Sequence, residues 1–155
     1  MSGNTFGEGI KPFNYGECQW DLIPAGTYEA SLYSWFTYKF INKSKVVFIF
    51  SITETGDYFG SYIPAFFEAS KLIDKPKEKG RFHAKPTGYL IRAIRRMIPD
   101  LPRKQRLDRL PLTKLLSNLY EIEVTDVNND FTGEDYEDFE KYSKVDKYNI
   151  RLKEL

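Results

Sequence analysis

The stretch TYEASLYSWFTYKF, residues 27–40, decides the fold class because polar and apolar side chains alternate along its length. Alternation in a stretch so rich in β-branched and aromatic residues predicts one long β-strand. Successive side chains of a strand point to opposite faces. One predicted face carries Tyr28, Ala30, Leu32, Ser34 and Phe36. The other face is more polar but carries two large rings, those of Tyr33 and Trp35.

Four more strands are expected on the same reasoning. A polar turn at residues 42–44 leads to a second strand at residues 45–53, KVVFIFSIT, antiparallel to the first. Its predicted core face consists of Val46, Phe48, Phe50 and Ile52. The third strand, residues 61–68, contains Pro64, which indicates a sheet edge or a bulge. Alternation predicts the fourth strand at residues 119–127 and the fifth at residues 147–155.

The connection between the third and fourth strands is predicted to be partly helical. Residues 71–86 are polar and are interrupted by Pro and Gly, so we expect a mobile surface loop there. Thr87 is the expected N-cap of a helix that Pro99 ends. Its apolar stripe consists of Leu90, Ile91, Ile94, Met97 and Ile98. A second, short helix is expected at residues 112–118.

Three strands, a helical insertion and two further strands are the element order of an OB-fold. We therefore expect a mainly β protein, a five-stranded OB-fold barrel with a helical insertion between strands 3 and 4. The 155 residues suffice for one domain, placed at residues 24–155, and residues 1–23 are expected to form an irregular N-terminal arm.

Charge is unevenly distributed along the chain, although the net charge is +1. Residues 71–115 carry 14 Lys and Arg against 4 Asp and Glu, a net charge of +10. Residues 116–155 carry 5 against 11, a net charge of −6. A strongly basic segment is typical of proteins that bind a polyanion. Alternatively, both segments are solvated faces that pair with each other.

Aromatic rings and cations together indicate a nucleic-acid surface, because rings stack on unpaired bases while cations neutralise phosphates. Aromatic residues make up 16% of the chain, about twice the ordinary share. The predicted nucleic-acid-binding residues are Tyr33, Trp35, Lys39, Lys45, Tyr62, Phe66, Lys77, Lys79, Arg81, Arg92, Arg95, Arg96, Arg103, Lys104 and Arg106. The alternative for each ring is packing under the arm or the helix.

Catalytic and metal chemistry lack convincing motifs. Cys18 and His83 are the only residues of their kinds, and we expect Cys18 to be packed and His83 to be exposed or facing phosphate. Asp126, Asn128, Asp130 and Glu137 match a calcium loop in spacing, but Phe131 occupies the position that requires Gly. The acidic residues 134–140 are expected to form a solvated loop. The sequence therefore predicts no enzyme, no metal and no cofactor, with a nuclease as the remaining catalytic alternative.

The chain resembles small OB-fold single-stranded DNA-binding proteins encoded by phages, plasmids and other mobile elements. The resemblance lies in PAGTYEASL (24–32), KVVFIFSI (45–52), GDYFG (56–60), RLDRLPLTKLL (106–116) and YSKVDKYNI (142–150). It implies a single-stranded DNA-binding protein, largely sequence-independent, that acts in replication or recombination. The alternative is a protein-interaction module, a phage accessory or inhibitor protein that uses the same aromatic face.

The expected partner is single-stranded DNA, with RNA as an open alternative, together with replication or recombination proteins. The chain lacks a signal peptide and a membrane-length apolar run, so we expect a cytoplasmic protein of a bacterial host cell. A homo-oligomer is expected because unpaired strand edges, such as that of residues 61–68, can pair between subunits.

Overall fold

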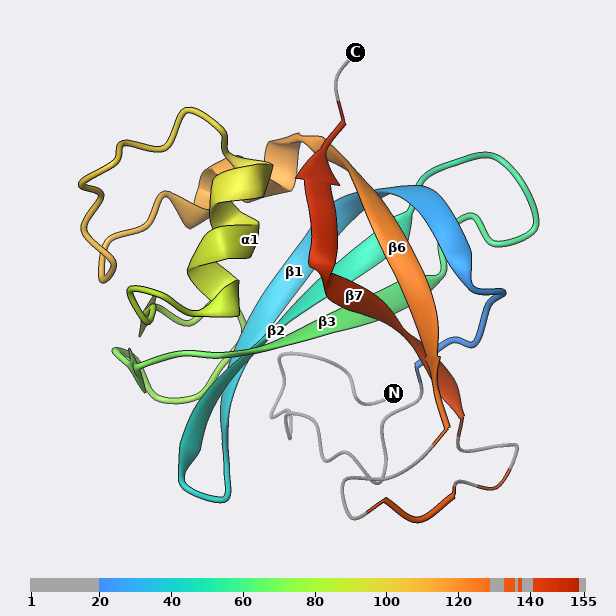
Figure 1. The fold of residues 1–155 in the computed structure, drawn as a ribbon, viewed down its shortest axis with the longest axis horizontal. Coiled ribbons are helices and arrows are strands. Elements are labelled where there is room, and N and C mark those ends of the chain that lie inside the picture. The colour runs from blue at the N-terminus through green and yellow to red at the C-terminus, as the bar shows by residue number, and fades with distance from the viewer. Residues whose placement is uncertain (1–19, 129–132, 136, 138–140, 154–155) are drawn as a thin grey trace.

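The structure, a computed structural model, describes residues 20–128, 133–135, 137 and 141–153 (Figure 1). Its elements are β1 (Gly26–Phe40), β2 (Lys43–Ile52), β3 (Tyr62–Glu68), β4 (Lys71–Leu72), β5 (Phe82–His83), α1 (Tyr89–Met97), the 3-10 helix η2 (Leu112–Ser117), β6 (Leu119–Val127) and β7 (Tyr142–Leu152). Cys18 lies outside the described residues, and so does the expected N-terminal arm apart from residues 20–23. Much of the acidic 134–140 loop also lies outside them.

Five long strands form one antiparallel sheet in the order β3-β2-β1-β6-β7, so the expected mainly β fold is confirmed. The described residues form no ladder between β3 and β7, and the sheet is not closed into a barrel. It is nevertheless strongly curved, because the rings of Phe66 on β3 and Tyr142 on β7 lie 6.4 Å apart between their centroids. Pro64 lies on the edge strand β3, as its missing N–H predicts.

The hairpin between β1 and β2 is tighter than the polar residues 42–44 suggest. Ile41 and Asn42 have φ angles of 50° and 62°, as expected for a two-residue type I′ turn. Lys43 and Ser44 already pair with Phe40 and Lys39 in the ladder. The predicted turn was therefore placed about one residue too late.

The main core fills the space between one face of the sheet and the helices. It includes Ala30, Leu32 and Trp35 of β1, Val46, Phe48, Phe50 and Ile52 of β2, Leu90, Ile91, Ile94 and Met97 of α1, Leu115 of η2, and Tyr120, Ile122 and Val124 of β6. The predicted core faces of β2 and α1 are both confirmed. Thr87 does not cap α1, because the N-cap position is one residue later, at Gly88, and no side chain bonds there.

A β-bulge in β1 overturns the predicted faces of this strand. The register with β2 shifts between Leu32 and Ser34, so Tyr33 is an extra residue. Before the bulge, Leu32 points into the main core, and after it Trp35 does. Phe36 consequently lies on the opposite face, although strict alternation predicts that it shares a face with Leu32.

That opposite face of β1 and β2 is also apolar. Phe36, Tyr38, Val47 and Ile49 are buried in a second core, against which Trp20, Phe40 and Phe66 pack. Two cores on one sheet account for much of the aromatic content of the chain. They also leave this face of the sheet with little free surface.

Residues 71–86 are not the irregular loop that their polarity predicts. β4 and β5 pair with each other, and the segment 77–79 runs along β1 (Figure 1). The N–H of Lys79 donates to the carbonyl oxygen of Trp35 at 2.7 Å, and that of Thr37 donates to the carbonyl oxygen of Lys77 at 3.0 Å. β6 pairs only with residues 26–31 of β1, so the 77–79 segment continues the same edge. Backbone pairing therefore orders a segment that has few apolar side chains.

β6 has the predicted bounds, whereas β7 begins at Tyr142, five residues before the predicted start. The second helix is a 3-10 helix at the predicted position. Its end is tied to β6, because the Tyr120 hydroxyl donates to the carbonyl oxygen of Leu115 at 2.6 Å.

Candidate nucleic-acid interface

The four predicted stacking rings do not form one surface. Trp35 is only 3% exposed, and its indole N–H donates to the carbonyl oxygen of Gly80 at 2.9 Å. Phe66 is partly buried against the second core. The prediction was wrong for Trp35 because the bulge at Tyr33 reverses which side chains face the main core.

Tyr33 and Tyr62 remain exposed, at 49% and 39%, and their ring centroids are 4.9 Å apart. An acid lies beside them, since the Asp21 carboxylate accepts the backbone N–H of Tyr62 at 2.9 Å. Burial, Tyr33 and Asp21 together raise the pKa of Tyr62. This pair therefore has exposed ring surface but a local charge that repels phosphate.

Lys45 belongs to a cluster of three lysines around one carboxylate. Glu68 lies 3.0 Å from Lys45, 2.9 Å from Lys85 and 3.5 Å from Lys43. Hydrogen bonds from Lys85 and Lys45 lower the pKa of Glu68 to about 2. The cluster holds two more positive charges than negative ones, and Lys39 is exposed on the neighbouring strand β1.

The lysine-rich segment at residues 71–86 is held in place on the surface. The backbones of Lys77 and Lys79 bond to β1, while their side chains are exposed. Arg81 forms a two-pronged pair with Asp74, with N···O distances of 2.8 and 3.1 Å. The hydrogen bonds from Arg81 lower the pKa of Asp74 to about 2. This segment is therefore not the mobile surface loop that its composition predicts.

The three arginines of α1 have different surroundings. Arg96 donates to the carbonyl oxygens of Lys147 at 2.8 Å and Ile150 at 2.9 Å, which ties α1 to β7. Arg95 donates to the carbonyl oxygens of Pro102 and Arg103, both at 3.2 Å. Of the three, Arg92 alone is exposed. Of the three predicted binding arginines, Arg95 and Arg96 therefore have part of their guanidinium donors engaged by backbone carbonyls.

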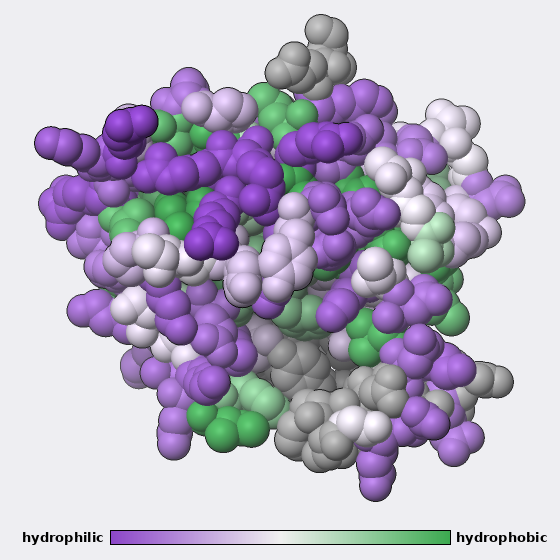
Figure 2. All heavy atoms as spheres, viewed as in Figure 1, coloured by the Kyte–Doolittle hydropathy of each residue, from purple (hydrophilic) through white to green (hydrophobic). Residues whose placement is uncertain are grey.

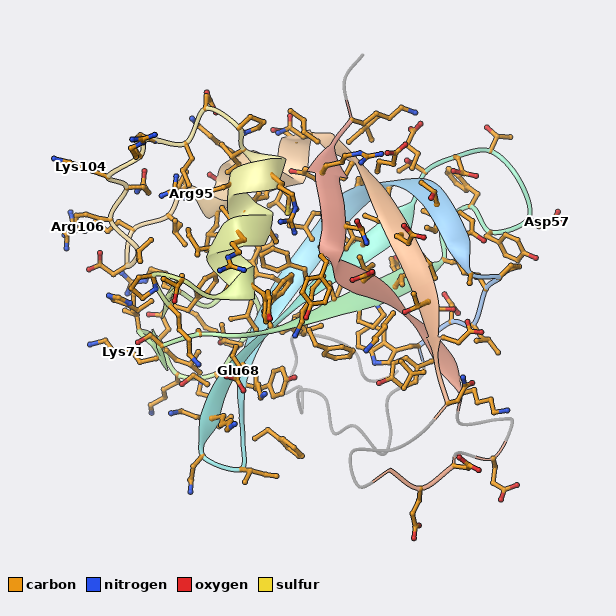
Figure 3. All side chains as sticks on the ribbon, in the orientation of Figure 1. Asp57, Glu68, Lys71, Arg95, Lys104 and Arg106 are labelled. Carbon is orange, nitrogen blue, oxygen red and sulfur yellow. The ribbon has the colours of Figure 1, made fainter. Side chains whose placement is uncertain are left out.

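Exposed cations nevertheless gather along the segment from β4 to η2. We call them the basic flank: Lys71, Lys75, Lys77, Lys79, Arg81, Lys85, Arg92, Arg103, Lys104, Arg106 and Arg109. Lys71, Lys104 and Arg106 extend outward on one side of the molecule, whereas Asp57 extends on the opposite side (Figure 3). The surface over α1 and the loops beside it is largely hydrophilic (Figure 2).

Among the described residues, no ion pair joins the basic flank to the acidic end of the chain. Within the described residues, the ion pairs of its members are with Asp74, Glu68 and Asp108. All three acids lie outside residues 116–155, so the described side chains show no ion pair between the two segments. Most of the positive charge of the segment remains exposed to solvent.

Two aromatic residues beside the basic flank were missed in the sequence. Tyr89, the first residue of α1, and Tyr148 of β7 are 43% and 56% exposed. Their ring centroids lie 4.9 Å apart, and the planes meet at 80°. The i, i+3 spacing of Tyr89 and Arg92 was a usable signal, but the approach of β7 was not, because it depends on tertiary structure.

No helix in the described residues is long and apolar enough to cross a membrane. In the same part of the chain, no three His, Cys, Asp or Glu side chains gather where they could hold a metal ion. Comparison with known proteins gives no match to a family model, a curated protein or a solved structure.

Proposed function

We propose that this protein binds single-stranded DNA, with little dependence on sequence, through the basic flank. The observation that carries the proposal is the gathering of exposed Lys and Arg side chains beside α1. Cations in such an array release the counterions of a phosphate backbone, which supplies most of the binding free energy of sequence-independent proteins. The role is binding rather than catalysis.

The strand order supports this proposal. Counted along the five long strands, the sheet has the order 3-2-1-4-5, and α1 lies in the connection from the third to the fourth. This is the order of a five-stranded OB-fold barrel that is left partly open, a fold that often binds oligonucleotides. We therefore propose that the protein has an OB-type fold. We further propose that it acts in the cytoplasm during replication or recombination of a phage or mobile element.

We propose that the bound DNA strand follows a different path from that in most OB-folds. In OB-folds the ligand crosses the face of strands two and three. Here that face carries the second core, with Val47 and Ile49 fully buried. The exposed cations lie instead around α1 and the segments on either side of it, so the strand is proposed to follow the basic flank.

Fluorescence anisotropy of labelled single-stranded and duplex oligonucleotides at two salt concentrations tests the proposal. We expect tighter binding to the single strand and affinity that falls steeply with salt. The double variant Lys104→Gln/Arg106→Gln should weaken binding and lower the salt slope by about 2. Lys144→Gln, an exposed lysine of β7 outside the flank, is the matched control and should change little.

Absence of binding by the wild-type protein at low salt would overturn this function. Capture of a protein partner that resists salt would then favour the protein-interaction alternative. That alternative no longer has the full aromatic face it assumed, because Trp35 is buried in the main core.

A further inference from the structure

A long irregularity in β7 directs two of its side chains toward α1. Ile122 pairs with Ile150, and two residues later Val124 pairs with Val145. Residues 146–149 therefore lie opposite the single residue Glu123. Extra residues in one strand bend it and redirect its side chains. Here they carry Lys147 and Tyr148 toward α1.

The shape of this bulge is fixed from within. The Asp146 carboxylate accepts the backbone N–H of Tyr148 at 3.0 Å and the side-chain amide of Asn149 at 2.9 Å. These two hydrogen bonds fold residues 146–149 around the Asp146 side chain. Asp146 is the one acid of the bulge, and Tyr89 and Asp146 both raise the pKa of Tyr148. Unlike the charge of Asp21, that of Asp146 has two cations beside it, Lys147 and Arg92, which lie over the Tyr89 ring.

The bulge is also docked on α1 by Arg96. One guanidinium group donates to the carbonyl oxygens of Lys147 and Ile150, on either side of Tyr148. A planar guanidinium presents its two nitrogens to the two acceptors in a fixed fork, whereas the donors of an ammonium all share one nitrogen. Tyr148 is consequently held in place relative to Tyr89 on the helix.

The result is a pair of exposed rings with two cations beside that of Tyr89. The Tyr89 and Tyr148 rings are in edge-to-face contact, with Lys147 Nζ 4.8 Å and Arg92 Cζ 5.7 Å from the centroid of the Tyr89 ring. Neither cation forms an ion pair with a carboxylate among the described residues. About half of each ring remains in contact with solvent.

We infer that Tyr89 and Tyr148 form a stacking site for an unpaired nucleobase, with Lys147 and Arg92 taking its flanking phosphates. The inference rests on the proposed function and adds the source of its strand preference. A base in a duplex is already stacked and paired, whereas an unpaired base has a free face for a tyrosine ring. Arg92 belongs both to this stacking site and to the basic flank. The DNA strand therefore passes from one to the other.

The test compares Tyr89→Leu and Tyr148→Leu with wild type, using labelled oligothymidine and a duplex of equal length. Leucine removes the ring face but no charge. We expect single-strand affinity to fall about 5- to 150-fold for each variant, duplex affinity to stay within about twofold, and the salt slope to be unchanged. Tyr58→Leu, a partly exposed tyrosine in an edge-to-face pair with Tyr28, is the matched control.

A second measurement uses the unaltered protein, so it does not depend on the variants folding. Irradiation of its complex with a 5-iodouracil oligonucleotide should attach the strand to Tyr89 or Tyr148, as read by peptide mass spectrometry. Adducts only at other residues, or full single-strand affinity in both leucine variants, would overturn the stacking site while leaving the proposed function intact. Failure of wild type to bind any strand would instead overturn the function itself.

Discussion

The indole N–H of Trp35 donates to the carbonyl oxygen of Gly80 at 2.9 Å, which links the centre of β1 to the segment that runs along its edge. Two backbone bonds accompany it, from Lys79 to Trp35 and from Thr37 to Lys77. The segment carries part of the basic flank, so the same contacts that fill the core also position cations on the surface. Trp35 therefore supports the candidate interface from beneath it.

Replacing Trp35 by Phe should lower stability and leave nucleic-acid affinity unchanged, because the two backbone bonds that hold Lys77 and Lys79 against β1 remain. Phenylalanine leaves a space in the main core and deprives the buried Gly80 carbonyl of its donor, at a cost of about 2–4 kcal/mol. Urea denaturation measures the first effect, and anisotropy, under conditions where the variant is folded, measures the second. A fivefold loss of affinity in the folded variant would return Trp35 to the binding surface.

Gly80 is needed because a side chain would collide with β1. A Cβ atom there would lie 2.6 Å from the Thr37 hydroxyl oxygen, which is fixed by bonds to the backbone of Lys77. Gly80→Ala should reduce the free energy of unfolding by about 1–3 kcal/mol. Thr37→Ala removes the colliding atom, so the double variant should lose less than the two single variants together, as read by urea denaturation. Additive losses would contradict the collision.

Sequence periodicity predicted the elements whose environment repeats regularly. β2 alternates between the two cores throughout, and α1 places Leu90, Ile91, Ile94 and Met97 on one side, so both core faces could be read directly. β6 likewise has the predicted bounds.

Prediction failed where one residue changes the phase or where long-range pairing decides. No local signal marks Tyr33 as a bulge, yet it exchanges the positions of Trp35 and Phe36. Segment 77–79 is polar, and its order comes from hydrogen bonds to a strand forty residues earlier, which local composition does not record. The patch of Tyr89 and Tyr148 depends on both effects, a bulge and a contact between distant elements.

Glu68 should make stability depend on pH in the acid range. Lys85 and Lys45 hold the pKa of its carboxyl at about 2 in the folded protein, against an ordinary value of 4.5. A lowered folded-state pKa stabilises the protein above the ordinary value, and that stabilisation disappears as pH falls from about 4.5 to about 2. Solvent screens these partly exposed pairs, so the contribution is about 1–2 kcal/mol.

The comparison of Glu68→Gln with wild type isolates this effect. Urea denaturation at pH 7 should show the variant less stable, and the difference should shrink as pH approaches 2. Glu123→Gln, an exposed acid of β6 with no ion pair among the described residues, serves as the control. A stability gap that stays constant with pH would show that Glu68 does not act through its charge.

Arg92 and Arg96 lie one turn apart on α1, and their substitutions should have opposite consequences. Arg96→Lys keeps the charge but replaces the Nε and Nη2 that bond the two carbonyl oxygens of the bulge by one nitrogen, so it should cost about 1–3 kcal/mol of stability and leave the salt slope of DNA binding unchanged. Arg92→Gln removes an exposed cation, so stability should change by less than about 0.5 kcal/mol and the salt slope should fall by about 1. Urea denaturation and salt titration of single-stranded DNA binding give both quantities for each variant. The reverse assignment, with Arg92 stabilising and Arg96 setting the slope, would mean that the bulge is held by something other than this guanidinium.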